Sequence, residues 1–324
     1  MKVLVTGGAG YIGSHFVKML LECGHQPIVL DNLSRGHKEA VPQAVLFEDI
    51  DLLDADALLY AIQTHLPAAV VHFAAFAYVG ESVKRPGIYY QNNVVGSLNL
   101  IRLCAENGVK NFIFSSTCSI YGNPTQVPIS EDQPSNPINP YANTKLMIET
   151  MLKDFETANG MKHVALRYFN AAGADPSGSI GESHDPEPHL IPIILEAALG
   201  KRKKVSVFGN DYDTTDGTCI RDYIHVNDLA DAHLKAIDYL INGNESTIIN
   251  LGTGKGNSVL EIIEKSKVIT EKEIPFEIVE RRAGDPAVLV ADNKKAREVL
   301  DWSPKYSIEK IIETAWRWHQ NPKY

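Results

Sequence analysis

The sequence has few of the features that mark secreted, membrane-spanning or nucleic-acid-binding proteins. Its four cysteines, Cys23, Cys104, Cys118 and Cys219, are too widely spaced for a disulfide framework or a metal-ligand motif. Acidic residues outnumber basic ones by 40 to 31, and the net charge of −9 argues against a surface that follows nucleic-acid phosphates. No apolar run approaches the roughly 20 residues of a membrane span, and no signal-peptide pattern opens the chain. We therefore expect a cytoplasmic protein with no metal site and no membrane or nucleic-acid partner.

Strand-like and helix-like segments alternate through the first half of the chain. The short apolar runs expected to form buried strands cover residues 2–6, 27–31, 45–47, 69–74, 111–117 and 164–170. Helical spacing occupies residues 11–23, 89–107 and 141–159 between them. This alternation predicts an α/β fold with a doubly wound, Rossmann-like parallel sheet.

The composition changes after residue 170. Residues 171–188 are rich in Gly, Pro, Ser and acidic residues, and we interpret them as a loop. A helix at 190–199, a strand at 205–208 and a polar loop to residue 217 follow. We predict a dinucleotide-binding domain over residues 1–170. Residues 171–324 are expected to form mainly a smaller, mixed α/β substrate-binding lobe, with some segments returning to the first domain.

Three glycines join the first predicted strand to the first predicted helix. Gly7, Gly10 and Gly13 space the first pair one residue wider than the common dinucleotide fingerprint. Glycine there permits a tight turn, close approach of a pyrophosphate and close helix–strand packing. Asp31 ends the second predicted strand, where a carboxylate suits the ribose hydroxyls of NAD and repels the extra phosphate of NADP. The pattern therefore favours NAD, although glycines that serve only geometry are the simpler alternative.

Tyr141 and Lys145 are four residues apart, which places both on one face of a helix. A lysine ammonium beside a phenol favours the phenolate, whose ordinary pKa of about 10 is too high for a base at neutral pH. The pair alone is a weak signal, because most such pairs lie on solvated helix surfaces. Downstream of a dinucleotide-binding turn, it predicts proton and hydride chemistry.

The glycine-rich turn together with Tyr141 and Lys145 resembles the extended short-chain dehydrogenase/reductase family. Further segments resemble the UDP-glucose 4-epimerases of that family, also called UDP-galactose 4-epimerases. These segments are 115–122, 167–170, 208–212, 221–226, 250–254 and 281–285. The resemblance extends from Met1 to about Trp302. It implies an NAD-dependent isomerase of galactose and nucleotide-sugar metabolism.

The resemblance also implies a role for each central residue. Tyr141 would take the proton of the sugar 4-hydroxyl while hydride passes from C4 to NAD, and hydride would return to the other face of a 4-keto sugar. Lys145 would lower the pKa of Tyr141 and hold the nicotinamide ribose. Thr117 would hydrogen-bond the reacting oxygen, although its hydroxyl could instead cap a backbone group.

Matching positions extend the predicted site. Those expected to face the cofactor are Gly7, Gly10, Tyr11, Ile12, Gly13, Asp31, Asn32, Asp49, Ile50, Phe73, Ala74, Asn92, Tyr141, Lys145 and Phe169. Those expected to face the UDP-sugar are Thr117, Tyr141, Asn170, His189, Leu190, Val207, Phe208, Arg221, Arg282, Asp285 and Leu289. Taken singly, Ile50 and Phe73 could be core residues, the arginines could form surface ion pairs, and His189 could be a loop histidine.

Two positions depart from the pattern. Ala77 stands where some relatives have a lysine that contacts the cofactor, and this version also resembles a branch that includes UDP-pentose 4-epimerases and bacterial hexose enzymes. Leu289 stands where some members have a tyrosine beside the sugar C2 substituent, so we expect some activity on UDP-N-acetylhexosamines.

Other functions remain as alternatives. A UDP-xylose/UDP-arabinose 4-epimerase is the nearest one. A dehydratase or decarboxylase is disfavoured because Cys118 and Ser119, rather than a carboxylic acid, follow Thr117. A non-catalytic NAD-binding regulator is disfavoured because Tyr141 and Lys145 are both present. The resemblance also implies a homodimer paired through the helices at 89–107 and 141–159, where Val94, Leu98 and Ile101 could instead cover the protein's own sheet.

Overall fold

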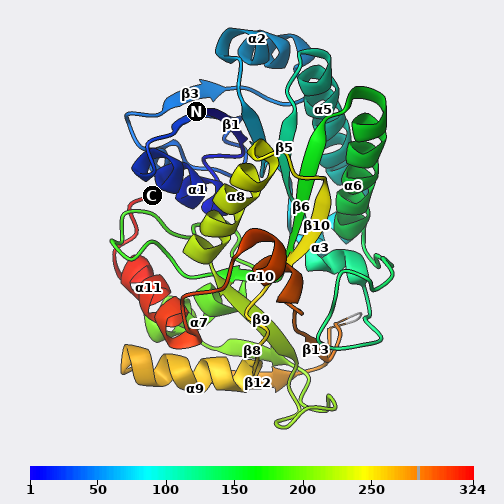
Figure 1. Ribbon diagram of the computed structural model, residues 1–324. Helices are drawn as coiled ribbons and strands as arrows, with labels where there is room; N and C mark the ends of the chain where they lie inside the picture. Colours follow the sequence, from blue (N-terminus) through cyan, green and yellow to red (C-terminus); the bar gives the residue numbers. More distant parts are fainter. Residues whose placement is uncertain (283–284) are drawn as a thin grey trace.

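The first lobe of the computed structural model is built on a seven-stranded parallel sheet (Figure 1). The structure describes residues 1–282 and 285–324. The strands lie in the order β10 (Thr247–Leu251), β6 (Lys162–Tyr168), β5 (Asn111–Ser115), β4 (Ala69–His72), β1 (Lys2–Thr6), β2 (Gln26–Asp31) and β3 (Leu46–Asp49). Each neighbouring pair is parallel. The predicted doubly wound α/β fold is confirmed.

Helices cover both faces of this sheet, as its unbroken apolar strands require. One face is covered by α1 (Tyr11–Glu22), α8 (Val226–Ile241) and α10 (Lys294–Leu300), and the other by α2 (Ala55–His65), α5 (Gly96–Glu106) and α6 (Pro140–Asn159). Val3 and Val5 of β1 pack with the first set of helices, and Leu4 between them packs with the second. Because successive side chains of a strand point to opposite faces of the sheet, one continuous apolar run contributes to two separate cores.

Strand β10 brings the later part of the chain back to the first lobe. It pairs with β6 in register, with Thr247 opposite Val164 and Leu251 opposite Tyr168. Helices α8 and α10 also pack on this sheet. The boundary at residue 170 remains a prediction, and any division of the chain there leaves these later segments on the first lobe.

The second lobe is smaller and mixed (Figure 1). Its strands are β7 (Asn170–Ala172), β8 (Val205–Phe208), β9 (Ile220–His225), β11 (Gly256–Ser258), β12 (Phe276–Val279) and β13 (Val288–Leu289). β9 pairs with β7, β11 and β13, while β8 pairs with β12. Helices α7 (Leu190–Ala198), α9 (Val259–Thr270) and α11 (Ile308–Gln320) pack on them around one apolar core.

Two predicted elements need correction. Residues 171–188 are not wholly a loop, because Asn170–Ala172 form β7 and pair with β9, with Asn170 opposite Tyr223. The helix predicted at 89–107 consists of α4 (Pro86–Tyr89), a π-helix η2 (Tyr90–Val95) and α5. A three-residue strand is too short to show a period, and a π-turn changes the hydrogen-bond register without changing the apolar spacing that sequence reports.

Three further short helices complete the described structure: η1 (Lys38–Ala40), α3 (Val79–Lys84) and η3 (Cys118–Tyr121). Among the described residues, no helix is both long enough and apolar enough to cross a bilayer.

Candidate active site

A cavity of about 850 Å³ lies between the carboxyl ends of the parallel strands and the second lobe. Gly7, Asp31, Phe73 and Tyr168 line it from the ends of β1, β2, β4 and β6 or just beyond them. The second lobe contributes the opposite wall, which includes Arg221 of β9. Open α/β sheets bind ligands at this edge, because the strand ends and the first turns of the helices converge there.

The glycine-rich turn leaves no space for side chains. Gly7 has a φ of +73°, and a Cβ on Gly13 would overlap the carbonyl oxygen of Gly7. Gly10 precedes α1 without a side-chain cap, and the first turn of α1 has no acidic residue. The free N–H groups and positive dipole end of α1 therefore suit an anionic group such as a pyrophosphate.

Asp31 is held in place at the end of β2. Its carboxylate accepts hydrogen bonds from the backbone N–H groups of Ala9 at 3.0 Å and Leu33 at 2.9 Å. Burial raises the pKa of Asp31 above its ordinary value, and these two hydrogen bonds oppose that shift. Asn32 also lines the cavity and donates to Asp51 at 2.9 Å.

Tyr141 and Lys145 are both buried in the first turns of α6. Asn139 caps this helix by accepting from the N–H of Ala142 at 2.9 Å, and Pro140 occupies the first helical position. The ammonium of Lys145 donates to the carbonyl oxygen of Ser115 at 2.8 Å and lies 5.9 Å from the Tyr141 ring centre. The predicted shared helix face is thus a buried face that lines the cavity.

Burial shifts the pKa values of both residues away from their charged forms. The pKa of Tyr141 is raised well above 10 by burial, and the Thr117 hydroxyl partly opposes the shift. Burial lowers the pKa of Lys145 to about 7, although Glu149 one turn further along α6 opposes it. The phenol is therefore neutral in this form of the site, and a phenolate requires further positive charge or hydrogen-bond donors beside it.

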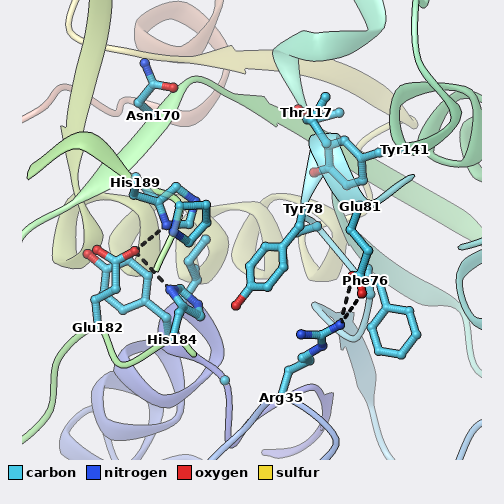
Figure 2. Close-up of a pocket in the computed structure, with 18 of the residues that line it drawn as sticks. Arg35, Phe76, Tyr78, Glu81, Thr117, Tyr141, Asn170, Glu182, His184 and His189 are labelled. Carbon is cyan, nitrogen blue, oxygen red and sulfur yellow. Dashed lines mark hydrogen bonds and ion pairs between the residues drawn. The ribbon is translucent and has the colours of Figure 1, made fainter. Parts of the chain in front are cut away.

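Thr117 lies close to Tyr141 in the site (Figure 2). Its hydroxyl oxygen accepts a hydrogen bond from the N–H of Ser119 at 3.1 Å and so caps η3. The capping role considered from the sequence is therefore present. It does not exclude contact with a ligand, because the hydroxyl proton is still available to donate into the cavity.

Cationic and aromatic side chains line the second-lobe wall. Arg221 donates to the carbonyl oxygen of Ile220 at 2.8 Å and lies 3.9 Å from the carboxylate of Asp285. The guanidinium of Arg282 lies 4.5 Å from the ring centre of Phe208. Arg221 thus forms a partly buried ion pair, and Arg282 is exposed. Guanidinium groups in such a wall suit a diphosphate.

Most predicted site residues lie in the wall of this one cavity. Those on the cofactor side are Gly7, Gly10, Tyr11, Ile12, Gly13, Asp31, Asn32, Ile50, Phe73, Ala74, Asn92, Tyr141, Lys145 and Phe169. Those on the substrate side are Thr117, Asn170, His189, Leu190, Phe208, Arg221, Arg282 and Asp285. Two residues of the motif at 281–285, Ala283 and Gly284, are outside the described residues.

Three predicted residues lie elsewhere. Asp49 is exposed at the end of β3, and Val207 is buried in the core of the second lobe. Leu289 packs on a small apolar cluster that includes Cys118 and Phe169. None of the three is in the cavity wall of the described structure, so their ligand contacts remain predictions.

Sequence reasoning missed several residues of the wall. Arg35 pairs with Glu81 at 2.8 Å and lies over the rings of Phe76 and Tyr78, at 5.2 Å and 4.9 Å (Figure 2). These residues come from loops and a short helix, where no periodicity shows that they converge. Arg35 follows Asp31 by four residues, where an arginine could accept the extra phosphate of NADP, but here it is paired with Glu81.

Glu182, His184 and Glu187 were also missed, although His189 of the same segment was predicted. Glu182, His184, Glu187 and His189 converge beside the cavity, and His189 lies 2.7 Å from Glu182. Burial alone would lower the pKa of His189, but Glu182 and Glu187 raise it to about 10. The alternation of acidic residues and histidines within eight positions was the available signal.

Comparison with known proteins agrees with this geometry. Residues 3–252 match the model of the NAD dependent epimerase/dehydratase family. The UDP-glucose 4-epimerase of Halalkalibacterium halodurans is 53% identical over 99% of this chain and 96% of its own. The chain belongs to the NAD dependent epimerase/dehydratase family.

Solved structures of relatives superpose over nearly the whole chain. The UDP-glucose 4-epimerase of Brucella ovis, solved in complex with NAD, has a TM-score of 0.95 and 49% identity, and 97% of each chain is covered. The UDP-Glc/GlcNAc 4-epimerase of Campylobacter jejuni has a TM-score of 0.87 and 46% identity, with 98% of this chain and 99% of that chain covered. The fold and its two-lobed arrangement are therefore those of epimerases.

The residues of the glycine-rich turn and of the end of β2 can hold NAD, the cofactor of this epimerase/dehydratase family. A Cβ at Gly7 would overlap the backbone of Ala74, so the turn brings bare backbone to the cavity. The uncapped start of α1 suits the pyrophosphate, and the Asp31 carboxylate suits ribose hydroxyls. Ala77, in place of the lysine of some relatives, also lines the cavity.

Proposed function

We propose that this protein interconverts UDP-glucose and UDP-galactose by inverting the configuration at C4. The observation that carries this proposal is that one cavity is lined on one side by the residues predicted for proton transfer and on the other by arginines. Tyr141, Lys145 and Thr117 lie on one side, and Arg221 and Arg282 lie on the other. That combination, in a chain of an NAD-dependent epimerase family, supports redox chemistry on the sugar of a nucleoside diphosphate sugar.

Each residue of the chain has a separate task in this reaction. The phenol oxygen of Tyr141 takes the proton of the C4 hydroxyl and later returns it. Lys145 contributes positive charge next to Tyr141, and Thr117 donates its hydroxyl proton to the reacting sugar oxygen. Bound NAD supplies a reversible hydride acceptor. Because Cys118 and Ser119 follow Thr117, the site has no carboxylic acid there to expel a hydroxyl, which disfavours dehydration.

The direct experiment is incubation of the purified protein with UDP-galactose and no added cofactor. We expect UDP-glucose to form and NAD to be released when the protein is denatured. Bound NAD without interconversion of this pair would contradict the proposed substrate. UDP-xylose and UDP-arabinose, assayed in parallel, would then show whether the pentose alternative applies; the names of the relatives favour hexoses.

A second substrate class has its own support. A similar solved protein is named a UDP-Glc/GlcNAc 4-epimerase. Leu289, which is smaller than the tyrosine of the resemblance, packs on Cys118 and Phe169 of the cavity wall. We propose that this site also accepts UDP-N-acetylglucosamine. No conversion of that sugar at high enzyme concentration would refute this extension and leave the hexose activity intact.

We further propose that the protein is a cytoplasmic homodimer, with residues 1–170 mainly binding NAD and residues 171–324 mainly binding the UDP-sugar. Leu98 of α5 and Met147 of α6 are 38% and 44% exposed, which supports an apolar contact between these helices and a second copy. Ile101, by contrast, is fully buried in the protein's own core. A monomeric mass by light scattering at micromolar concentration would contradict the dimer.

A further inference from the structure

Four ligand-type side chains converge where the loop after β7 meets the start of α7. Nδ1 of His189 lies 2.7 Å from Oε1 of Glu182 and 3.0 Å from Oε1 of Glu187. Nδ1 of His184 lies 3.2 Å from Oε1 of Glu182 and 3.5 Å from Oε2 of Glu187. One ligand atom from each residue lies within 4.8 Å of all the others. Figure 2 shows both imidazole rings next to the Glu182 carboxylate.

The backbone that carries this cluster is fixed from several directions. The indole N–H of Trp318 donates to the carbonyl oxygen of Glu182 at 2.7 Å. The Tyr324 hydroxyl donates to the carbonyl oxygen of Gly181 at 3.0 Å, and the N–H of His189 donates to Glu187 at 2.8 Å. The cluster is therefore a built site, whose members are held before any ligand binds.

In the described part of the chain, the two carboxylates of this cluster are not paired with lysine or arginine. The Glu182 and Glu187 side chains are 4% and 5% exposed. Within the described residues, their ion-pair partners are the two histidines, and neither pairs with a lysine or arginine. Oε1 of Glu182 is fully buried, and neither imidazole contact gives it a hydrogen bond of acceptable geometry. Two buried carboxylates require about two positive charges, from two imidazolium protons or from one divalent cation.

We propose that Glu182, His184, Glu187 and His189 form a binding site for one divalent transition-metal ion, with Zn²⁺ the best-fitting probe. Zinc bonds of about 2.0–2.1 Å to nitrogen or oxygen place tetrahedral ligand atoms about 3.3–3.5 Å apart. The four nitrogen–oxygen distances are 2.7 to 3.5 Å, and the two that involve Glu187 end on its two different oxygens. With one ligand atom from each residue every separation is within 4.8 Å, so small side-chain rotations would complete a tetrahedron. Two imidazoles with two carboxylates suit zinc and similar metals better than Mg²⁺ or Ca²⁺, which prefer all-oxygen sites.

The position of the site gives the ion a structural role. Tyr11, at the start of α1, donates to the carbonyl oxygen of Gly173, and its ring centre lies 6.3 Å from that of His184. Glu182 and His189 also line the cavity. A bound ion fixes this stretch of wall between the glycine-rich turn and α7. This role is separate from the proton transfer assigned to Tyr141. Because His189 also lies on the substrate side of the cavity, the site is tested by measuring bound metal rather than epimerase activity.

The test measures metal on the untagged full-length protein with its NAD bound. After treatment with a chelator, the protein is dialysed against buffered Zn²⁺, and bound zinc is measured by atomic emission. We expect one zinc per chain, bound with submicromolar affinity. Co²⁺ should give the intense visible absorption of a four-coordinate site and should be displaced by Zn²⁺.

Variants distinguish this site from adventitious binding. His184→Ala should weaken zinc binding by at least about 100-fold, because loss of even outer partners of a metal costs about 10–100-fold. His189→Ala, at the half-exposed position, should do the same if the first variant does not fold. His65→Ala, which removes a separate histidine–glutamate pair with Glu48, should leave binding unchanged. Stoichiometry well below one, or equal binding by all variants, would overturn the site and support a cluster of two imidazolium–carboxylate pairs.

Discussion

The central residues carry pKa values that oppose their proposed roles until a ligand is present. Burial raises the pKa of Tyr141 and lowers that of Lys145 to about 7. A tyrosine base requires the reverse shift, and positive charge entering the cavity is the physical means to obtain it. In the proposed reaction, positive charge brought by bound NAD would therefore have to lower the pKa of Tyr141.

The first prediction concerns the Tyr141 hydroxyl. Tyr141→Phe keeps the buried ring but removes the proton acceptor, so kcat for UDP-galactose should fall by about 10²–10⁴-fold. NAD measured after denaturation should remain near one per chain. Tyr60→Phe, at a 67% exposed position, is the matched control and should retain full activity. Turnover of Tyr141→Phe within a few-fold of the parent would refute its role as the base.

The second prediction concerns Gly13. A methyl group there would overlap the carbonyl oxygen of Gly7, whereas Gly87 has no atom within 4 Å of such a group. Gly13→Ala should therefore distort the turn and reduce the NAD retained through purification, while Gly87→Ala should not. Equal NAD content in the two variants, measured after denaturation, would show that the turn does not need the glycine.

At the scale of elements, the sequence predicted those helices and strands whose ends are marked by local residue patterns. β1, β2, α1 and α6 begin and end within one or two residues of their predicted positions, because apolar period, glycines and prolines mark them. β7 and the π-helix η2 were missed. The first depends on pairing with β9 far along the chain, and the second contains Asn93, which hydrogen-bonds Phe76 and Thr144 of other segments. Such contacts leave no period in the sequence.

The site divides in the same way. Residues in motifs, such as Gly7, Tyr141 and Arg221, were predicted and line one cavity. Arg35, Glu81 and Glu182 were not, because they belong to loops whose course is set by tertiary packing. Val207 and its neighbour Phe208 differ, since Phe208 lines the cavity while the side chain of Val207 faces the core. Alternation along a strand separates two adjacent residues of one motif.

The third prediction concerns a buried ion pair between α6 and β6. Glu149 accepts hydrogen bonds from Arg167 at 2.9 and 2.6 Å and from Ser116 at 2.6 Å. Glu149→Gln leaves the Arg167 charge buried without a counterion, which should lower the free energy of unfolding by about 3–5 kcal/mol. It should also lower the pKa of Lys145 further, because Glu149 raises it.

An exposed pair is the control for this variant. Glu106 pairs with Arg102 one turn apart on α5, and such pairs contribute about 0.5 kcal/mol or less. Urea denaturation of Glu149→Gln and Glu106→Gln gives both values. Similar losses for the two variants would mean that the buried pair contributes no more than a surface one.

At the scale of the whole molecule, the chain crosses between its lobes to build the cavity. The chain leaves the first lobe after β6, returns through α8 and β10, and returns again through α10 before it ends in α11 (Figure 1). Several crossings fix the two walls relative to each other. The geometry of the cavity therefore depends on the stability of both lobes. Conditions that unfold either lobe should release both NAD and the UDP-sugar.

The last prediction is acid lability, which arises from four buried histidines in different parts of this shared structure. Burial lowers the pKa of His15 and His233 to about 4, and of His72 and His225 to about 3. In the unfolded chain a histidine has a pKa of about 6.5, so between pH 6.5 and 4 the unfolded chain holds protons that the folded chain excludes. Stability should therefore fall as pH falls through this range.

The slope of the free energy of unfolding against pH follows from the number of protons that the chain takes up on unfolding. Four histidines would give a slope of about 5 kcal/mol per pH unit near pH 5. Asp228, whose pKa burial raises to about 6, binds one proton in the folded state, so these five groups together contribute about 4 kcal/mol per pH unit. Burial also raises the pKa of Asp31, Glu131 and Asp222, which reduces the slope, and lowers that of His163 and His319, which increases it. His233→Leu should lower it by a further 1.4 kcal/mol per pH unit, or about one proton. Urea denaturation from pH 6.5 to 4.5 measures both slopes, and an unchanged slope in the variant would show that His233 is already protonated in the folded protein.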